Sequence, residues 1–225
     1  INSVSSNDPL MLNQWAISKM DLINAWDITT GSSAIKVGVI DSGIDGNHPD
    51  LTNQLDKSLS RSFCDDNSSP LIDGMGHGTH VGGIIGAQGN NNIGVTGTCW
   101  NITLVSLRIC NSQGQIATSD IVNAVNYATQ QSIPILNCSV GFYNYSPELE
   151  QAISIYPGLF VCAAGNDETC TDLFPEWPMG YNCDNILTVG ASNSDDELYI
   201  SNDGLNNGSN YGKFSVDIFA PGFIF

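Results

Sequence analysis

The stretch AIKVGVIDSG, residues 34–43, decides the fold class. Its apolar and β-branched residues run almost without interruption to Asp41, which is typical of a strand buried on both faces. Similar runs follow at ITLVSLRIC (102–110), SIPILNCSVG (132–141), GLFVCAAGN (158–166) and NILTVGAS (185–192). Because strands buried on both faces need a covering layer on each side, these runs predict a parallel sheet.

Helical patterns alternate with these strands. TSDIVNAVNYATQQ (118–131) is apolar at Ile121, Val122, Val125 and Ala128, and Thr118 or Ser119 is expected to cap its start. PELEQAISIY (147–156) carries a second, weaker helical pattern, and SNDGLNNGSNYG (201–212) is expected to be an exposed loop. The alternation predicts an α/β fold, with a mostly parallel central sheet and helices on both faces, in one domain over residues 1–225.

The charge balance excludes whole classes of partner. Six Lys and Arg residues stand against 23 Asp and Glu residues, a formal net charge of −17, which repels phosphate backbones and anionic membrane surfaces. No apolar run approaches the roughly 18–20 residues that span a bilayer. We therefore expect a protein that binds neither nucleic acid nor membranes. We also expect it to act as a monomer. The free carboxylates fit either calcium binding or simple solubility.

The seven cysteines contain no CxxC pair, which argues against a zinc cluster or a thioredoxin-like motif. Cys138 and Cys162 lie in strand-like runs and are expected to be buried thiols. Cys170 and Cys183 flank a loop-like stretch and would form a surface disulfide in an exported protein.

Polar residues at the ends of the predicted strands are the candidates for chemistry, since the functional crevice of a parallel sheet lies there. Asp41 would orient a neighbouring group, His77 would accept a proton from a nucleophile, and Asn166 would donate to negative charge on a substrate oxygen. Each has an ordinary alternative: an Asp that caps a turn, a histidine that packs, and an Asn in a left-handed turn.

Five blocks carry a family resemblance: VIDSGIDGNHPDL (39–51), GHGTHVGGIIGA (76–87), NCSVG (137–141), AAGN (163–166) and VDIFAPG (216–222). In order and spacing they resemble the subtilisin-like serine peptidases over essentially the whole chain. The resemblance implies a three-layer fold and a serine endopeptidase that cleaves extended peptides or protein substrates. It also implies that Asp41 and His77 belong to an Asp-His-Ser triad and that Asn166 is the oxyanion-hole amide.

The resemblance further implies a substrate-binding cleft. One wall of the S1 pocket would be Ser139, Val140 and Gly141, the other Ala163, Ala164 and Gly165, and an edge strand for the substrate backbone would be Gln113, Gly114 and Gln115. The family usually has a second glycine after the first in the S1 segment. Here Phe142 follows Gly141, which would narrow or reshape the pocket entrance.

The family's nucleophilic serine lies in a Gly-Thr-Ser-Met-Ala block beyond APG, and no GTS occurs in this chain. We therefore expect these 225 residues to be inactive alone, as a fragment of an active enzyme whose C-terminal part is missing. A truncated, non-catalytic peptide-binding protein is the alternative. A weaker one is a metal-dependent hydrolase that uses His77 and His80, three residues apart, with His48, Asp41 and Asp50 as further ligands.

A structural calcium site is also implied by the resemblance. Its side-chain oxygens would come from Asp8, Asp50 and Asn91, and its backbone oxygens from Gly89, Ile93 and Val95. The alternative is an Asn-rich solvated loop. The resemblance also favours secretion, a propeptide as a further partner, and a cis peptide at the pair Trp177-Pro178.

Overall fold

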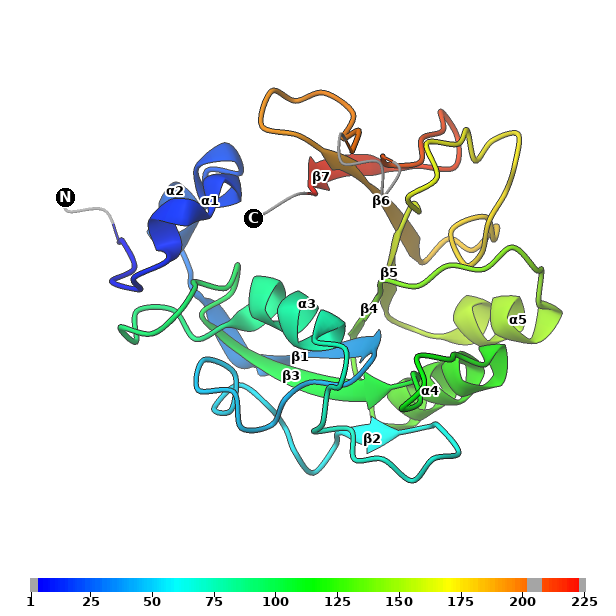
Figure 1. Ribbon diagram of the computed structural model, residues 1–225, viewed down its shortest axis with the longest axis horizontal. Helices are drawn as coiled ribbons and strands as arrows, with labels where there is room; N and C mark the ends of the chain where they lie inside the picture. Colours follow the sequence, from blue (N-terminus) through cyan, green and yellow to red (C-terminus); the bar gives the residue numbers. More distant parts are fainter. Residues whose placement is uncertain (1–3, 202–207, 223–225) are drawn as a thin grey trace.

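The computed structural model describes residues 4–201 and 208–222, in which seven parallel strands form one sheet (Figure 1). The spatial order of the strands is β2-β3-β1-β4-β5-β6-β7. Their bounds are β1 Gly31–Asp41, β2 Arg61–Ser62, β3 Asn101–Arg108, β4 Ile135–Cys138, β5 Leu159–Ala163, β6 Ile186–Ser192 and β7 Ile218–Pro221. The predicted parallel sheet is therefore confirmed.

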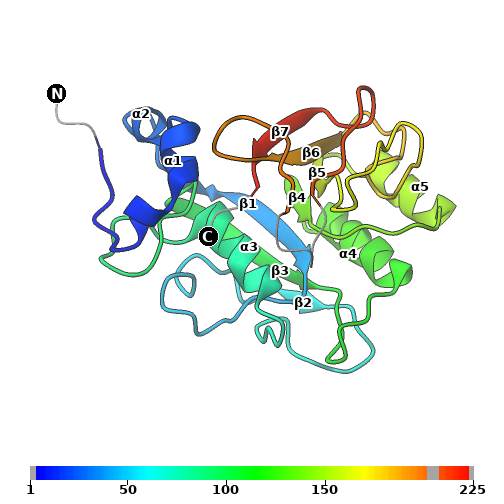
Figure 2. The same ribbon diagram turned by 45° about the horizontal axis from the view of Figure 1, so that its top comes forward.

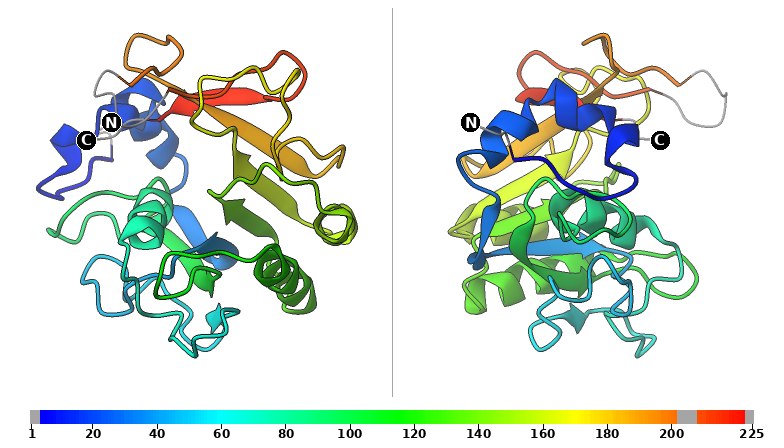
Figure 3. Two further views of the ribbon diagram at one scale, coloured as in Figure 1. Left: turned by 45° about the vertical axis from the view of Figure 1, so that its right-hand side comes forward. Right: turned by 90° about the vertical axis from the view of Figure 1, so that its left-hand side faces the viewer.

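Helices cover both faces of this sheet, which makes three layers (Figures 1 and 3). α3 (His77–Gly86) lies on one face, and α4 (Thr118–Gln130) and α5 (Pro147–Ile155) lie on the other. The short helices η1 (Met11–Asn13), α1 (Trp15–Lys19) and α2 (Leu22–Trp26) precede β1 and lie next to its beginning, away from α4 and α5 (Figure 2). No helix in the described ranges is long and apolar enough to cross a bilayer.

Each face of the sheet has its own hydrophobic core, as expected for strands with a side-chain period of two. In β1, Val37 and Val39 pack in the core beneath α3, whereas Ile40 packs in the larger core beneath α4 and α5. The thiols of Cys138 and Cys162 lie in this larger core, so the prediction that they are buried is confirmed.

Three glycines spaced four residues apart bring α3 close to the sheet. A Cβ added at Gly78 would collide with the carbonyl oxygen of Gly43, and one at Gly86 would lie 2.6 Å from Cγ2 of Ile102. Gly82 lies between them on the same helix face, since residues four apart share a face. These glycines therefore determine how closely α3 packs on the strands, and with it the position of His77.

The five predicted strands and two predicted helices are confirmed, but the cap predicted for the first helix is wrong. α4 already begins at Thr118, so the cap position falls on Ala117, which has no hydroxyl. At α5 the hydroxyl oxygen of Ser146 accepts a hydrogen bond from the backbone N–H of Leu149 at 3.2 Å.

Two further predictions fail because local pairing holds the residues elsewhere. The predicted disulfide between Cys170 and Cys183 does not form, because all seven cysteines are free thiols. The backbone of Cys170 pairs with that of Tyr211 in an isolated β-bridge, whereas the side chain of Cys183 packs against the core beneath α4 and α5. In the predicted exposed loop, residues 202–207 lie outside the described ranges. Ser209 and Asn210 are buried, because their polar groups bond to the chain near β5 and β6.

Candidate active site

The sheet topology places the candidate site at the carboxyl ends of β1 and β4. β1 has β3 on one side and β4 on the other, so connections leave in opposite directions at this point and a crevice forms between them. Ile40 is in register with Cys138, so Asp41 and Ser139 emerge side by side from neighbouring strands. α3 begins at His77 above the same edge (Figure 1).

His77 and Asp41 form an ion-pair geometry at this edge. Nδ1 of His77 lies 2.8 and 2.9 Å from the two carboxylate oxygens of Asp41. Because a carboxylate only accepts, Nδ1 must carry the proton in this contact. The Asp41 side chain is 4% exposed and the His77 side chain 51% exposed, so the second ring nitrogen has access to the cleft.

The hydrogen bond from His77 to Asp41 raises the pKa of His77, against the opposing effect of burial, and the charges of Asp41 and Asp73 add to the increase. The ring therefore binds a proton more readily than a free histidine. That is the property required of a general base that becomes positively charged during a reaction.

Asp73 is a further carboxylate at the start of α3, and the sequence predictions did not include it. Its carboxylate accepts hydrogen bonds from the backbone N–H of Gly76 at 2.9 Å, the backbone N–H of Thr79 at 2.8 Å and the hydroxyl of Ser42 at 2.8 Å. Burial opposes ionisation of Asp73, but the hydrogen bonds from Thr79, Ser42 and Gly76 lower its pKa overall. Asp73 thus fixes the first turn of α3, which carries His77. An Asp just before a helix start is the signal that would have revealed it.

The cleft beside His77 brings two of the three predicted substrate-binding stretches together. A pocket of about 190 Å³ is lined by Asp41, His77, Gly114, Ser139 and Val140, among other residues. Gln113 and Gln115 flank Gly114 in the sequence and are exposed. Residues 112–114 form a turn rather than a strand, because the side-chain oxygen of Asn111 accepts from the N–H groups of Gln113 and Gln115. Pairing of this stretch with a substrate backbone stays a prediction.

The third predicted stretch ends β5. Ala163 closes the strand, Ala164 is buried, and Gly165 has φ +102°, a left-handed conformation that favours glycine. Asn166 follows as an exposed residue, in agreement with its predicted position at the strand end. Together with Ser139 it lines a groove of about 400 Å³.

Phe142, the residue after Gly141, pairs with the segment around Trp177. Its backbone exchanges two hydrogen bonds with Trp177, at 2.7 and 2.9 Å, and its side chain packs against the α4 and α5 core. The peptide between Trp177 and Pro178 is cis, as predicted. Phe142 therefore helps to hold the segment that carries the buried Glu176, and its effect on a pocket entrance stays a prediction.

The residues predicted to hold calcium converge where the N-terminal segment meets the loop after α3. Asp8 accepts from the backbone N–H of Asn91 at 2.9 Å, and Asp50 accepts from the side-chain amide of Asn91 at 2.8 Å and the N–H of Val95 at 3.0 Å. Ile93 is tied to the loop by its N–H, which donates to the side-chain oxygen of Asn91 at 2.8 Å. Gly89, at the start of the loop, packs against Trp100.

The chemistry of this donor set fits a hard cation. Asp8 and Asp50 are 5% and 1% exposed, and neither belongs to an ion pair in the described ranges. Burial raises the pKa of Asp50, and the charge of Asp8 adds to this increase, although hydrogen bonds from Asn91 and Val95 oppose it. A cation between the two carboxylates would relieve both unfavourable effects, and carboxylate and amide oxygens are the ligands that calcium prefers.

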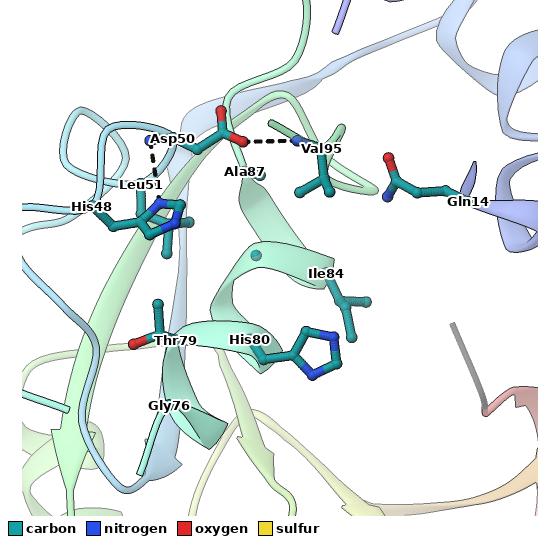
Figure 4. Close-up of a pocket in the computed structure, with 11 residues that line it drawn as sticks. Gln14, His48, Asp50, Leu51, Gly76, Thr79, His80, Ile84, Ala87 and Val95 are labelled. Carbon is teal, nitrogen blue, oxygen red and sulfur yellow. Dashed lines mark hydrogen bonds between the residues drawn. The ribbon is translucent and has the colours of Figure 1, made fainter. Parts of the chain in front are cut away.

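His80 and His48 do not join His77. They line a different pocket, of about 270 Å³, with Asp50 and Gln14 (Figure 4). Within residues 4–201 and 208–222 no group of three or more His, Cys, Asp or Glu side chains has the arrangement of a metal site. The metal-dependent hydrolase alternative therefore has no support in the geometry.

Comparison with known proteins now decides the family. The model of the subtilase family, Peptidase_S8, matches residues 32–223. The chain belongs to the subtilase family. This match includes β1 with Asp41, α3 with His77 and the segment after β5 with Asn166, so the residues that the fold brings to one edge all lie in the matched region.

Two curated relatives and one solved structure show how far the similarity extends. This subtilase is 35% identical to halolysin from Haloferax mediterranei over 224 residues, which is 97% of this chain but 40% of halolysin. It is 31% identical to thermitase from Thermoactinomyces vulgaris over 220 residues, which is 96% of this chain and 73% of thermitase. A protease structure from Pseudoalteromonas arctica superimposes with a TM-score of 0.82 at 26% identity, covering 97% of this chain and 73% of that one.

Proposed function

We propose that this subtilase is part of a serine endopeptidase in which His77 is the general base and Asp41 orients it. The observation that carries the proposal is the contact of His77 Nδ1 with both oxygens of the buried Asp41, which leaves the other ring nitrogen open to the cleft. A serine nucleophile would come from a segment that follows residue 225. In support, the chain covers 40% of halolysin and 73% of thermitase, so these relatives contain further segments.

The chemistry follows from these roles. The open nitrogen of His77 takes the proton of the serine hydroxyl as its oxygen attacks the carbonyl carbon of the peptide bond. His77 then gives this proton to the leaving amine when the C–N bond breaks, and water releases the acyl group by the same steps. The side-chain amide of Asn166 donates a hydrogen bond to the carbonyl oxygen as negative charge develops on it.

The segment that carries the serine would bind in the groove of about 400 Å³ that Asn166 lines. Val81 and Ile84 of α3 form one side, and Val161 of β5 and Ala191 of β6 are among the residues opposite. An apolar segment in this groove would lie between His77, at the start of α3, and Asn166. Without it, residues 1–225 alone would have the base and the oxyanion donor but no nucleophile, and would be inactive.

The substrates would be extended peptides or unfolded protein segments, since the cleft beside His77 is lined by backbone-rich stretches around Gly114 and Ser139. The proposal includes action as a monomer outside the cell, with a propeptide as an additional partner. Fractionation of the producing cells and N-terminal sequencing of the mature protein would test export and propeptide removal.

A structural calcium ion belongs to the same proposal. Asp8, Asp50 and Asn91 would hold it with side-chain oxygens, and Gly89, Ile93 and Val95 with backbone carbonyl oxygens, after the amide of Asn91 turns its oxygen inward. The ion would fasten the N-terminal segment to the loop after α3 and take no part in the chemistry.

The test is hydrolysis of a denatured protein by the product of the complete reading frame. We expect hydrolysis that disappears in the variants His77→Ala and Asp41→Ala. Folded protein without hydrolysis of any substrate would sink the peptidase proposal and leave peptide binding as the function to measure. Hydrolysis that survives His77→Ala would show that another site carries the activity.

A further inference from the structure

We propose that Glu176 is a specificity-determining residue that selects substrates with Lys or Arg immediately before the cleaved bond. The inference rests on the proposed function, because it names the substrate class of the same site. No signal in the sequence marked Glu176, apart from its place directly before the pair Trp177-Pro178.

The position of the Glu176 carboxylate is set by the two predicted walls of the S1 pocket. A Cβ added at Gly141, in the segment after β4, would lie 3.7 Å from Oε2 of Glu176. A Cβ added at Gly165, in the segment after β5, would lie 3.1 Å from the same oxygen. Oε2 therefore lies close to one glycine of each predicted wall.

The opposite side of the Glu176 carboxylate is held in place. Its Oε1 accepts a hydrogen bond from the side-chain amide of Asn210 at 2.8 Å, and Asn210 is fully buried. The side-chain oxygen of Asn210 in turn accepts from the backbone N–H of Asp167 at 2.8 Å and of Thr169 at 2.9 Å. Asn210 thus ties Glu176 to the backbone that continues from the Gly165 wall, so the carboxylate cannot easily turn away.

The charge around Glu176 lacks a positive partner. Glu176 is 7% exposed, and the side chain of a second acid, Asp167, lies within hydrogen-bond reach of it. The ion pairs in the described ranges are Lys19 with Asp196, His77 with Asp41 and Arg108 with Asp66, and none involves Glu176 or Asp167. Burial raises the pKa of Glu176, the hydrogen bond from Asn210 opposes this, and the charge of Asp167 adds to the increase.

A cationic substrate side chain would relieve this unfavourable arrangement. An ammonium or guanidinium group between Gly141 and Gly165 would meet Oε2 of Glu176 with a charge-assisted hydrogen bond, and the charge of Asp167 would attract the same group. An apolar side chain of similar length would instead leave the carboxylate buried without a partner, which is costly.

The experiment compares peptides that differ only in the residue before the cleaved bond: Lys, Arg, norleucine and Phe. With the product of the complete reading frame, we expect kcat/KM for Lys and Arg to exceed that for norleucine about tenfold to a hundredfold. Glu176→Gln should remove this preference and leave norleucine and Phe peptides within about threefold of the native rate. Glu197→Gln, the same change at an exposed glutamate, should leave all four rates unchanged.

Two results would overturn the proposal. One is equal cleavage of the Lys and norleucine peptides by the native protein. The other is an equal loss on all four peptides in Glu176→Gln, which would indicate a purely structural role. If no peptide is cleaved at all, the peptidase proposal fails separately, and dissociation constants for the four peptides decide the present one: Lys and Arg must bind about tenfold more tightly than norleucine, and Glu176→Gln must abolish the difference.

Discussion

Two buried carboxylates in this subtilase, Asp41 and Glu176, have opposite surroundings. Asp41 has a hydrogen-bond donor supplied by the chain itself, since Nδ1 of His77 contacts both of its oxygens and the ring becomes a cation when it takes a second proton. Glu176 has the neutral amide of Asn210 and, instead of a cation, a side-chain hydrogen bond with a second acid, Asp167. Because a buried charge needs compensation, the first arrangement is complete within the chain, whereas we propose that the second is completed by a bound substrate side chain.

This difference separates the residues that we propose for catalysis from the residue that we propose for substrate recognition. The pair of Asp41 and His77 is held by backbone contacts at the start of α3, so its geometry exists before a substrate arrives. Glu176 is also held by Asn210, but its Oε2 lies close to two glycines, Gly141 and Gly165. Asp8 and Asp50 resemble Glu176 in lacking a positive partner in the described ranges, which is why we assign them to a bound cation.

Replacing His77 breaks the complete pair and should have the largest effect. In the product of the complete reading frame, His77→Ala should lower kcat/KM by about 10⁴-fold or more, because no other group can take the serine proton. His80→Ala is the matched control, since His80 lies one turn along α3 and lines a different pocket (Figure 4). Its kcat/KM should stay within about twofold of the native value, and a comparable loss in both variants would contradict the assignment.

Removal of calcium tests whether Asp8 and Asp50, two buried carboxylates without an ion-pair partner in the described ranges, hold a cation. Chelation should lower the free energy of unfolding by about 2–3 kcal/mol relative to a solution with calcium at a hundred times its dissociation constant. Asp50→Asn should abolish this calcium dependence, whereas Asp195→Asn, at an exposed position, should preserve it. Urea unfolding with and without calcium measures both. Unfolding curves that coincide in the native protein would rule out the proposed ion.

The close packing of α3 against the sheet should be necessary for the contact between Asp41 and His77. Gly78→Ala places a Cβ against the carbonyl oxygen of Gly43 and beside Asp41, and should cost about 1–3 kcal/mol of stability and lower activity. Gly83→Ala is the control in the same helix, where an added Cβ meets no atom within 4 Å, and it should gain about 0.5–1 kcal/mol. Equal unfolding midpoints for the two variants would contradict the packing argument.

The pH dependence of activity sharpens the account of His77. Its pKa is raised chiefly by the hydrogen bond to Asp41, so the neutral ring that acts as base becomes available only above the ordinary histidine range. kcat/KM should therefore rise with pH through an apparent pKa above about 6.5. In Asp41→Asn the remaining activity should rise at lower pH, because the imidazolium loses its anionic partner. A rise at unchanged pH would show that Asp41 does not control the ring.

The sequence was most informative where structure follows from local pattern. The uninterrupted apolar run before Asp41 predicted β1, and the helical spacing of apolar residues from Ile121 to Ala128 predicted α4. Asp41, His77 and Asn166 could be predicted because they lie at the ends of strongly patterned elements and in recognisable blocks. Their contact across 36 positions of the chain, between His77 and Asp41, required the fold.

Residues whose roles depend on distant partners could not be predicted. Glu176 and Asn210 lie 34 positions apart, in segments without periodic pattern, and only the fold joins them behind the glycine walls. The Cys170 and Cys183 prediction failed for the same reason, since spacing along the chain says nothing about which partners a loop meets. Gln113 and Gln115 were expected in a strand, but the side chain of Asn111 bends their backbone into a turn.

Covalent labelling gives the most direct test of the pair formed by Asp41 and His77. The product of the complete reading frame would be treated with a serine-directed fluorophosphonate and digested, and the adduct located by mass spectrometry. We predict a single labelled serine beyond residue 225, with labelling lost in His77→Ala and retained in His80→Ala. Absence of an adduct on the folded native protein, or equal labelling of His77→Ala, would contradict the assignment of His77 as the base that activates a serine.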